Sequence, residues 1–489
     1  MAGIGFELRK LYTDKSAYGY TKAFTWTGIV TAGPFALMVV LLLGVQLLYG
    51  YFGVADFYRS LYNESMVYPF IFSHIIVSGC HMVITRYISD RFYIYDTKSL
   101  GSTVYGIIAV ALVIGGLIGM AFFCWASLPF FLKVTTYVFY MGMICVLLLS
   151  SFVSALRNYT KIVNAYAAGV GVGIISIFLL LYLDLYSSDN LVIWTMLGMD
   201  LVVAVIAGSL WWHIVQFFGV IRELDFYFID YFSTKKTLFF INFFYTIGLY
   251  AHNIIIWFGP AGECLENTYY FQPSYDTSTF FAYISTLPVM LLFVISTEIH
   301  FYEKYRQYLG FITKKGNYVE IDFSRREMLQ IMWIEIRNVF DFQLVAALCF
   351  IAIGNILLPK IGLANYGLDV YNVLVLSAFC VAVFQSIMIF LLYLEDRVGA
   401  LRTTAIFAGT SIVFNVICVS IGESTYGFGA FLASFLTMMY SLYRLNDYSK
   451  EIDYHIFCSQ PVLNAPDKGF FVTLKNKIYK QEVRLNAKK

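Results

Sequence analysis

The chain alternates between long apolar segments and short polar connections, and its basic residues are unevenly distributed between those connections. Hydropathy predicts twelve apolar segments, each of about the 20 residues that a helix needs to cross a hydrocarbon core of about 30 Å. When these segments are threaded alternately through a bilayer, 30 of the 33 Lys and Arg residues fall on one side, and only Arg59, Lys133 and Lys360 fall on the other. Because Lys and Arg mark the cytoplasmic side of a membrane protein, both termini are predicted to be cytoplasmic.

The composition supports a membrane protein, because 60% hydrophobic and 13% charged residues leave too little polar surface for a soluble globule of 489 residues. The predicted fold class is an all-α polytopic membrane protein, with twelve transmembrane helices in two six-helix lobes. The predicted parts are a cytoplasmic amphipathic N-terminus (1–23), an N-lobe with spans 1–6 (24–220), a cytoplasmic linker (221–236), a C-lobe with spans 7–12 (237–445) that contains a cytoplasmic loop (303–341), and a cytoplasmic tail (446–489).

Catalytic and metal-binding patterns are not evident in the sequence. There is no P-loop, no H-E-x-x-H and no G-x-S-x-G. The eight cysteines include only Cys264 in a predicted external loop, so no external disulfide is expected. The net charge of +2 gives no reason to expect nucleic acid. We therefore expect a transporter or channel with no cofactor and no metal, surrounded by the lipid bilayer.

Polar side chains within the predicted spans are the candidates for a translocation pathway, since each costs free energy in lipid. Two sets occur at helical spacing on one face each: His74, Ser78, His81 and Thr85 in span 2, and Asn242, Thr246, Tyr250 and Asn253 in span 7. The alternative interpretation is that they form hydrogen bonds between packed helices. Asp200, near the middle of span 6, could bind a cation or proton, or could be a structural hydrogen-bonding group.

Three residues are candidates for helix bends: Gly33 and Pro34 in span 1, and Pro288 in span 8. The external loop before span 8 combines acidic and aromatic residues that could contact an emerging cationic sugar polymer, or could anchor the loop at the interface. The candidates are Glu263, Glu266, Tyr269, Tyr270, Tyr275 and Asp276.

The cytoplasmic loop 303–341 contains an S-x-x-E sequence, Ser324 to Glu327, that predicts a helix start by its capping-box pattern. The apolar residues that follow, from Met328 to Phe340, have the spacing of one helix face. We expect a helix at the membrane surface before span 9, which either anchors the loop or docks a cytoplasmic partner.

Five short sequences carry a resemblance to a known family: Met1-Ala-Gly-Ile-Gly-Phe-Glu-Leu-Arg-Lys-Leu11, Ala32-Gly33-Pro34, Thr85-Arg86-Tyr87-Ile88-Ser89-Asp90-Arg91, Ser154-Ala155-Leu156-Arg157-Asn158-Tyr159 and Thr297-Glu298-Ile299-His300-Phe301-Tyr302. These sequences resemble the PelG family of exopolysaccharide exporters. They sample the chain from residue 1 to about 302, and the twelve-span plan extends the likeness to the whole length. The opening sequence is the most specific of them.

The resemblance implies a twelve-helix member of the multidrug/oligosaccharidyl-lipid/polysaccharide exporter superfamily. Proteins of this kind carry the Pel exopolysaccharide, a cationic polymer rich in N-acetylgalactosamine, across the bacterial cytoplasmic membrane. The implied partners are a PelF-type cytoplasmic glycosyltransferase and PelD- and PelE-type membrane proteins. The alternatives left open are a flippase for a lipid-linked oligosaccharide, an ion-coupled drug exporter, a membrane-embedded glycosyl- or acyltransferase, and a scaffold for the glycosyltransferase.

Overall fold

The computed structural model describes residues 17–94, 98–156, 158–183, 190–219, 226, 228–313, 316–363, 365–455 and 473, with side chains from Thr25 onward. The predicted N-terminus (1–23) and tail (446–489) therefore lie largely outside the described residues. The chain divides into two compact units. Unit 1 contains residues 17–32, 247–263 and 270–455, and unit 2 contains residues 33–246 and 264–269. The boundaries fall inside two helices, after Ala32 and after Thr246.

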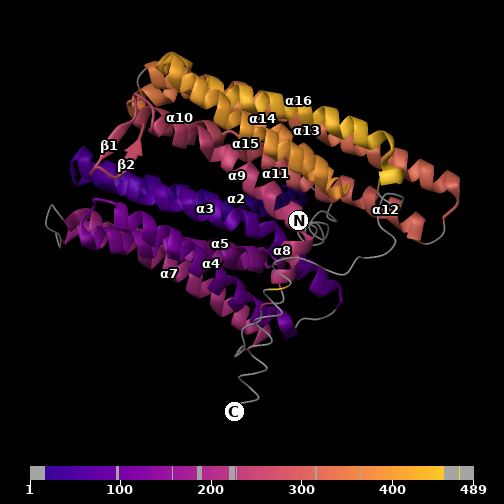
Figure 1. Cartoon of the computed structure of the whole chain (residues 1–489), viewed down its shortest axis with the longest axis horizontal. Helices are drawn as coiled ribbons and strands as arrows, with labels where there is room; N and C mark the ends of the chain where they lie inside the picture. Colours follow the sequence, from indigo (N-terminus) through magenta and orange to yellow (C-terminus); the bar gives the residue numbers. More distant parts are fainter. Residues whose placement is uncertain are drawn as a thin grey trace, which may run out of the picture. The chain divides into compact units, whose positions relative to one another are not determined.

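Unit 2 is built from antiparallel membrane helices around α5 and α7, which lie side by side (Figure 1). Its helices are α2 (Ala17–Tyr51, which begins in unit 1), α3 (Asp56–Tyr93), α4 (Lys98–Trp125), α5 (Phe130–Ala155), α6 (Tyr159–Tyr182), α7 (Leu191–Phe218), the short α8 (Ile229–Thr234) and the first half of α9 (Lys236–Trp257). Apolar residues at 3.6-residue spacing form the core between them, and Val146, Leu148 and Met199 are fully buried.

Unit 1 packs its helices around α14, the most buried of the membrane helices (Figure 1). After α9 comes a hairpin of two short strands, β1 (Glu263–Leu265) and β2 (Tyr269–Phe271), of which residues 264–269 belong to unit 2. Unit 1 continues with α10 (Pro273–Ile284), α11 (Leu287–Ser296), the π-helix η2 (Thr297–Phe301) and α12 (Tyr302–Thr313). The remaining elements are α13 (Tyr318–Leu357), the 3-10 helices η3 (Leu358–Ile361) and η4 (Glu423–Thr425), α14 (Asn365–Tyr393), α15 (Arg397–Ile421) and α16 (Phe428–Lys450).

Eleven helical segments in the described part of the chain are long and apolar enough to cross a membrane. The twelfth predicted span is α16, which is a helix but is not among these eleven. Its buried face carries Ser434, Thr437 and Ser441, which lower its hydropathy. The prediction of an all-α polytopic membrane protein is confirmed, and the two-lobe division at residues 221–236 stays a prediction.

The helix-bend candidates lie in different local environments. Pro34 lies inside the continuous helix α2, directly after Gly33. Predicted span 8 is divided, because α10 ends at Ile284 and α11 begins at Leu287 with Pro288 in its first turn. Proline is well tolerated in the first turn of a helix, where an N–H has no intrahelical acceptor.

The predicted helix start at Ser324 is wrong. Helix α13 begins at Tyr318, after the N-cap residue Asn317, whose side chain accepts the Glu320 N–H at 2.9 Å while the Glu320 carboxylate accepts the Asn317 N–H at 3.0 Å. Ser324 is buried inside the helix. The predicted surface helix and span 9 are also one continuous helix of 40 residues, because no glycine or proline interrupts it before Gly354.

Candidate functional site

The polar residues of α3 form hydrogen bonds within unit 2. The Nδ1 atom of His81 lies 2.6 Å from the Ser151 hydroxyl of α5. That hydroxyl also lies within hydrogen-bonding distance of the Leu147 carbonyl, to which it donates at 2.8 Å. The Thr85 hydroxyl donates to the His81 carbonyl, and the Ser78 hydroxyl donates to the Ile75 carbonyl at 2.7 Å.

The polar stripes of α3 and α9 meet in unit 2. The Asn242 amide donates to the Ser78 carbonyl at 2.7 Å, and the Thr246 hydroxyl donates to the Asn242 carbonyl at 2.9 Å. The helices approach closely because Gly79 has no side chain, and a Cβ there would lie 2.5 Å from the Phe239 ring. The bond from Asn242 to Ser78 is an interhelical hydrogen bond of the kind that the alternative interpretation expects, and a role in a pathway stays a prediction.

The second half of the α9 stripe belongs to unit 1, where Asn253 binds a carboxylate of α10. The Asn253 amide and the Trp257 indole N–H each donate to Asp276 Oδ1 at 2.8 Å. The Gln272 backbone N–H donates to Asp276 Oδ2 at 3.0 Å. Both oxygens of Asp276 are therefore occupied, and this carboxylate holds the start of α10 against the end of α9. Tyr250 is half-buried on the same helix.

The external candidates separate into surface and buried residues. Glu263 and Glu266 are exposed and Tyr270 is half-buried, whereas Tyr269 and Tyr275 are 0% exposed. In unit 2, Tyr269 packs against Tyr68 with ring centroids 4.9 Å apart, and burial raises the pKa of its hydroxyl to about 12. The hairpin turns at Glu266 and Asn267, which have φ values of 50° and 47°. Of the six candidates, Glu263, Glu266 and Tyr270 keep side-chain surface open to solvent, and a contact with a polymer stays a prediction.

Asp200 is half-buried on α7, inside a membrane-crossing segment. Its Oδ1 atom is buried and accepts no hydrogen bond from the described residues. A carboxyl group in this position is costly unless it is protonated or binds a cation. The structure leaves that oxygen available for either, and a coupling role for Asp200 stays a prediction.

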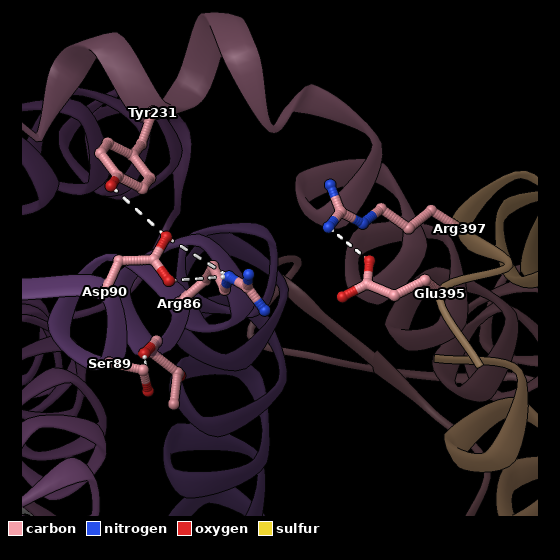
Figure 2. Close-up of polar contacts among 7 residues, drawn as sticks. Arg86, Ser89, Asp90, Tyr231, Glu395 and Arg397 are labelled. Atoms are coloured by element: carbon pink, nitrogen blue, oxygen red, sulfur yellow. Dashed lines mark hydrogen bonds and ion pairs between the residues drawn. The ribbon is translucent and has the colours of Figure 1, made fainter. Parts of the chain in front are cut away.

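The sequence Thr85–Arg91 ends α3 and connects it to α8 within unit 2 (Figure 2). Arg86 Nε lies 3.1 Å from Asp90 Oδ1, and the Tyr231 hydroxyl donates to Asp90 Oδ2 at 3.4 Å. The Tyr87 and Tyr231 rings meet edge to face at 4.9 Å, and the Arg91 guanidinium lies over the Tyr87 ring. Sequence reasoning missed Tyr231, which lies 141 residues from Asp90. Arg157 of the neighbouring resemblance sequence lies outside the described residues.

The sequence Thr297–Phe301 of unit 1 forms a π-helix. This conformation is rare in proteins, but where it occurs it often lies at a functional site. The π-helix follows Ser296, whose hydroxyl donates to the Glu335 carboxylate of α13. His300 Nδ1 lies 3.1 Å from the other Glu335 oxygen. Glu335 is 3% exposed, and it stands out in the sequence only as an acid within an otherwise amphipathic run. Elsewhere in unit 1, Figure 2 shows Arg397 paired with Glu395.

Metal ligation is not supported by the described part of the chain, where no group of three His, Cys, Asp or Glu side chains could hold an ion. The seven cysteines in the described ranges are free thiols, and Cys458 lies outside those ranges.

Solved structures with this helical arrangement are MATE transporters of the MOP superfamily. An outward-facing MATE multidrug transporter superposes with a TM-score of 0.54 at 12% identity, covering 87% of this chain and 96% of that one. A MATE transporter in complex with MaL6 gives a TM-score of 0.55 at 11% identity, with 88% and 97% covered. A MOP superfamily transporter from Pyrococcus furiosus gives 0.52 at 12% identity, with 88% and 96% covered. At these identities the likeness shows the fold.

The chain is therefore a multi-pass helical membrane protein with a MATE-like fold. Residues 1–457 match the family described as "PelG: Putative exopolysaccharide Exporter (EPS-E)". The chain therefore belongs to the PelG family, as the short sequences at its start and at the ends of its spans predicted. No curated protein matches the sequence significantly.

Proposed function

We propose that this protein carries a Pel-type polysaccharide, cationic and rich in N-acetylgalactosamine, across the bacterial cytoplasmic membrane. The observation that carries the proposal is the match of residues 1–457 to an exopolysaccharide exporter family in a chain with a MATE-like fold. The polymer is the cargo that the family resemblance implies, and the absence of an enzyme motif in the sequence agrees with a transport subunit.

The proposed pathway uses the polar faces of α3 and α9 and the carboxyl group of Asp200. Asn242, Ser78 and His81 supply amide, hydroxyl and imidazole groups along these helices. Asp200 supplies an acid whose buried oxygen has no described hydrogen-bond donor. An acid suits a cationic cargo or a coupled proton better than a base would.

A test of the pathway is the substitution Asp200→Asn, which removes the charge and keeps the shape. We expect less secreted polymer, measured with a lectin that binds N-acetylgalactosamine, at an unchanged amount of protein in the membrane. Asp200→Glu should retain part of the export. Asp56→Asn is the matched control, because the Asp56 side chain is 95% exposed. Normal secretion by Asp200→Asn would remove this residue from the pathway.

The proposed docking segment for a PelF-type glycosyltransferase is the first half of α13 with α12. Helix α13 has 40 residues and is about 60 Å long, twice the hydrocarbon thickness. Its last charged residue before the apolar run is Asp341, so the preceding residues extend beyond the bilayer core. Tyr318, Val319 and Phe323 are 81%, 73% and 64% exposed at that end. Exposed apolar side chains outside lipid favour a protein partner.

The basic residues of this segment are largely engaged within unit 1. Arg325 lies 2.7 Å from Asp453, the carboxylate that also accepts the Tyr308 hydroxyl, and Lys304 lies 3.0 Å from Glu327. We therefore expect the apolar face, and not free arginines, to dock the partner. Val319→Glu should reduce copurification of the glycosyltransferase, whereas Arg326→Ala, at a side chain that is 76% exposed, should retain it. Retention by Val319→Glu would place the dock elsewhere.

A further inference from the structure

A cavity of about 410 Å³ lies on unit 2 between the beginning of α6 and the end of α7. Its polar and aromatic lining consists of Lys161 and Asn164 from α6, and Ser209, Trp212, His213 and Gln216 from α7. These residues follow helical spacing on one face of each helix. None of the proposed pathway residues lines this cavity, so it is a separate feature of the unit.

Beside the cavity, the two helices pack closely at two glycines. Gly169 and Gly173 let α6 contact α7, and a Cβ at these positions would lie 2.5 Å from Ile206 and 2.2 Å from Val202. Toward the end of α7, Gly208 faces open space, because nothing lies within 4 Å of a Cβ built there. Small residues therefore line the open part and leave the volume unfilled.

The chemistry of the lining favours an anion. Lys161 is a cation, and no Asp or Glu is among the residues that line the cavity. Asn164, Gln216 and Ser209 add amide and hydroxyl donors. Both ring nitrogens of His213 are buried and have no hydrogen-bond partner among the described residues. A buried imidazole without partners costs free energy, and a bound ligand that accepts its N–H would remove that cost.

The position of the cavity favours a lipid. On the same helices, Ile175, Phe178 and Leu201 are 60%, 41% and 44% exposed, and in a multi-pass membrane protein such apolar surface faces acyl chains. Lys161 is the third residue of α6, and Trp212 is 64% exposed six positions before the end of α7 at Phe218. Lysine and tryptophan at helix ends mark the headgroup region of a bilayer.

We propose that this cavity binds the headgroup phosphate of an anionic phospholipid. The Lys161 ammonium group pairs with the negative charge of the phosphate. The His213 N–H and the side-chain amides of Asn164 and Gln216 donate hydrogen bonds to the phosphate oxygens. The acyl chains continue along the apolar outer faces of α6 and α7. The site is independent of the cargo that the protein carries.

The test measures binding of phosphatidylglycerol and phosphatidylcholine to the purified full-length protein by native mass spectrometry, with inorganic phosphate as a competitor. We expect wild type to bind phosphatidylglycerol preferentially, and Lys161→Ala to weaken that binding roughly tenfold, as for a hydrogen bond to a charged group. The matched control is Lys133→Ala, because Lys133 also lies in the first turn of a membrane helix and does not line the cavity. Binding to it should equal wild type.

His213→Gln provides a second variant that keeps a donor and an acceptor, and it should retain more binding than His213→Phe. Equal binding of the two lipids by wild type would overturn the proposal, as would an equal loss in the Lys161 and Lys133 variants. Displacement of the lipid by millimolar inorganic phosphate would show a free-anion site and would also overturn it. Lipid binding is compared only between variants whose Tm equals that of wild type. Lys161→Ala should meet this condition, because the Lys161 side chain is exposed.

Discussion

Substitution of Asp396 by Asn tests whether the ion pair between α15 and α16 holds unit 1 together. Asp396 precedes α15, and its Oδ1 accepts the Gly399 N–H at 2.9 Å as an N-cap. Arg444 of α16 donates from Nε to Oδ2 at 2.7 Å and from Nη2 to Oδ1 at 3.1 Å. The side chains are 4% and 21% exposed. One carboxylate therefore caps a helix and neutralises a guanidinium.

The expected destabilisation follows from which of these interactions Asn can keep. Asn caps helices about as well as Asp, so the cap contributes little to the loss. Removing one partner of a buried pair costs about 3–5 kcal/mol. Arg444 keeps one-fifth of its exposure and remains partly hydrated. We therefore expect about 2–3 kcal/mol, which corresponds to a fall in Tm of roughly 4–12 °C for a unit of this size.

The assay is thermal unfolding of the purified protein in one detergent, arranged as a double-mutant cycle. Asp396→Asn and Arg444→Gln should each lower Tm, and the double variant should lose less than the sum because no buried charge remains unpaired. Asp56→Asn is the control, since Asp56 is 95% exposed in its pair with Arg59, and it should leave Tm unchanged. Additive losses within about 0.5 kcal/mol would refute the reasoning.

Three further predictions concern packing, the hairpin and topology. Gly79→Ala should lower Tm, because its Cβ would lie 2.5 Å from the Phe239 ring, whereas Gly171→Ala in open space should not; equal effects in a thermal scan would contradict this. Asp276→Asn removes a carboxylate that accepts hydrogen bonds from three donors, and it should speed protease cleavage of the hairpin after α9. An unchanged cleavage rate would count against the role of Asp276 in anchoring α10 to α9. Glu423→Cys, in a variant whose exposed Cys124, Cys264 and Cys349 are replaced by Ser, should react with an impermeant maleimide on intact cells, and protection would contradict the predicted threading.

The local sequence was sufficient to predict the membrane helices but not the residues at which they begin and end. Helix α13 shows the reason, since both Asn317 to Glu320 and Ser324 to Glu327 have the spacing of a capping box. Only one can begin the helix, and the earlier one does, because nothing between it and Ser324 stops helix propagation. The pattern therefore predicted a helix and a cap but misplaced the start.

For the candidate polar residues, the sequence predicted a shared helix face but not the residues that they contact. Periodicity predicted one polar helix face with Ser78 and His81 and a second with Asn242, and these residues lie in the helices α3 and α9. Their partners depend on how helices pack, so the contacts of Asn242 with Ser78 and of His81 with Ser151 were not predictable. Burial in the external loop was not predictable either. The composition of the loop suggested a contact surface, whereas the Tyr269 side chain is buried.

The sequence by itself determined that this is a polytopic helical membrane protein and which family it belongs to. Both follow from local properties of the chain, namely the hydropathy of each span and the short family sequences. Tertiary structure alone decided the pairs that join distant residues, such as Asp396 with Arg444 and Asp90 with Tyr231. It also decided the open cavity at Lys161 and His213. Such features arise from the geometry of packed helices, which depends on side-chain fit between segments far apart in the chain.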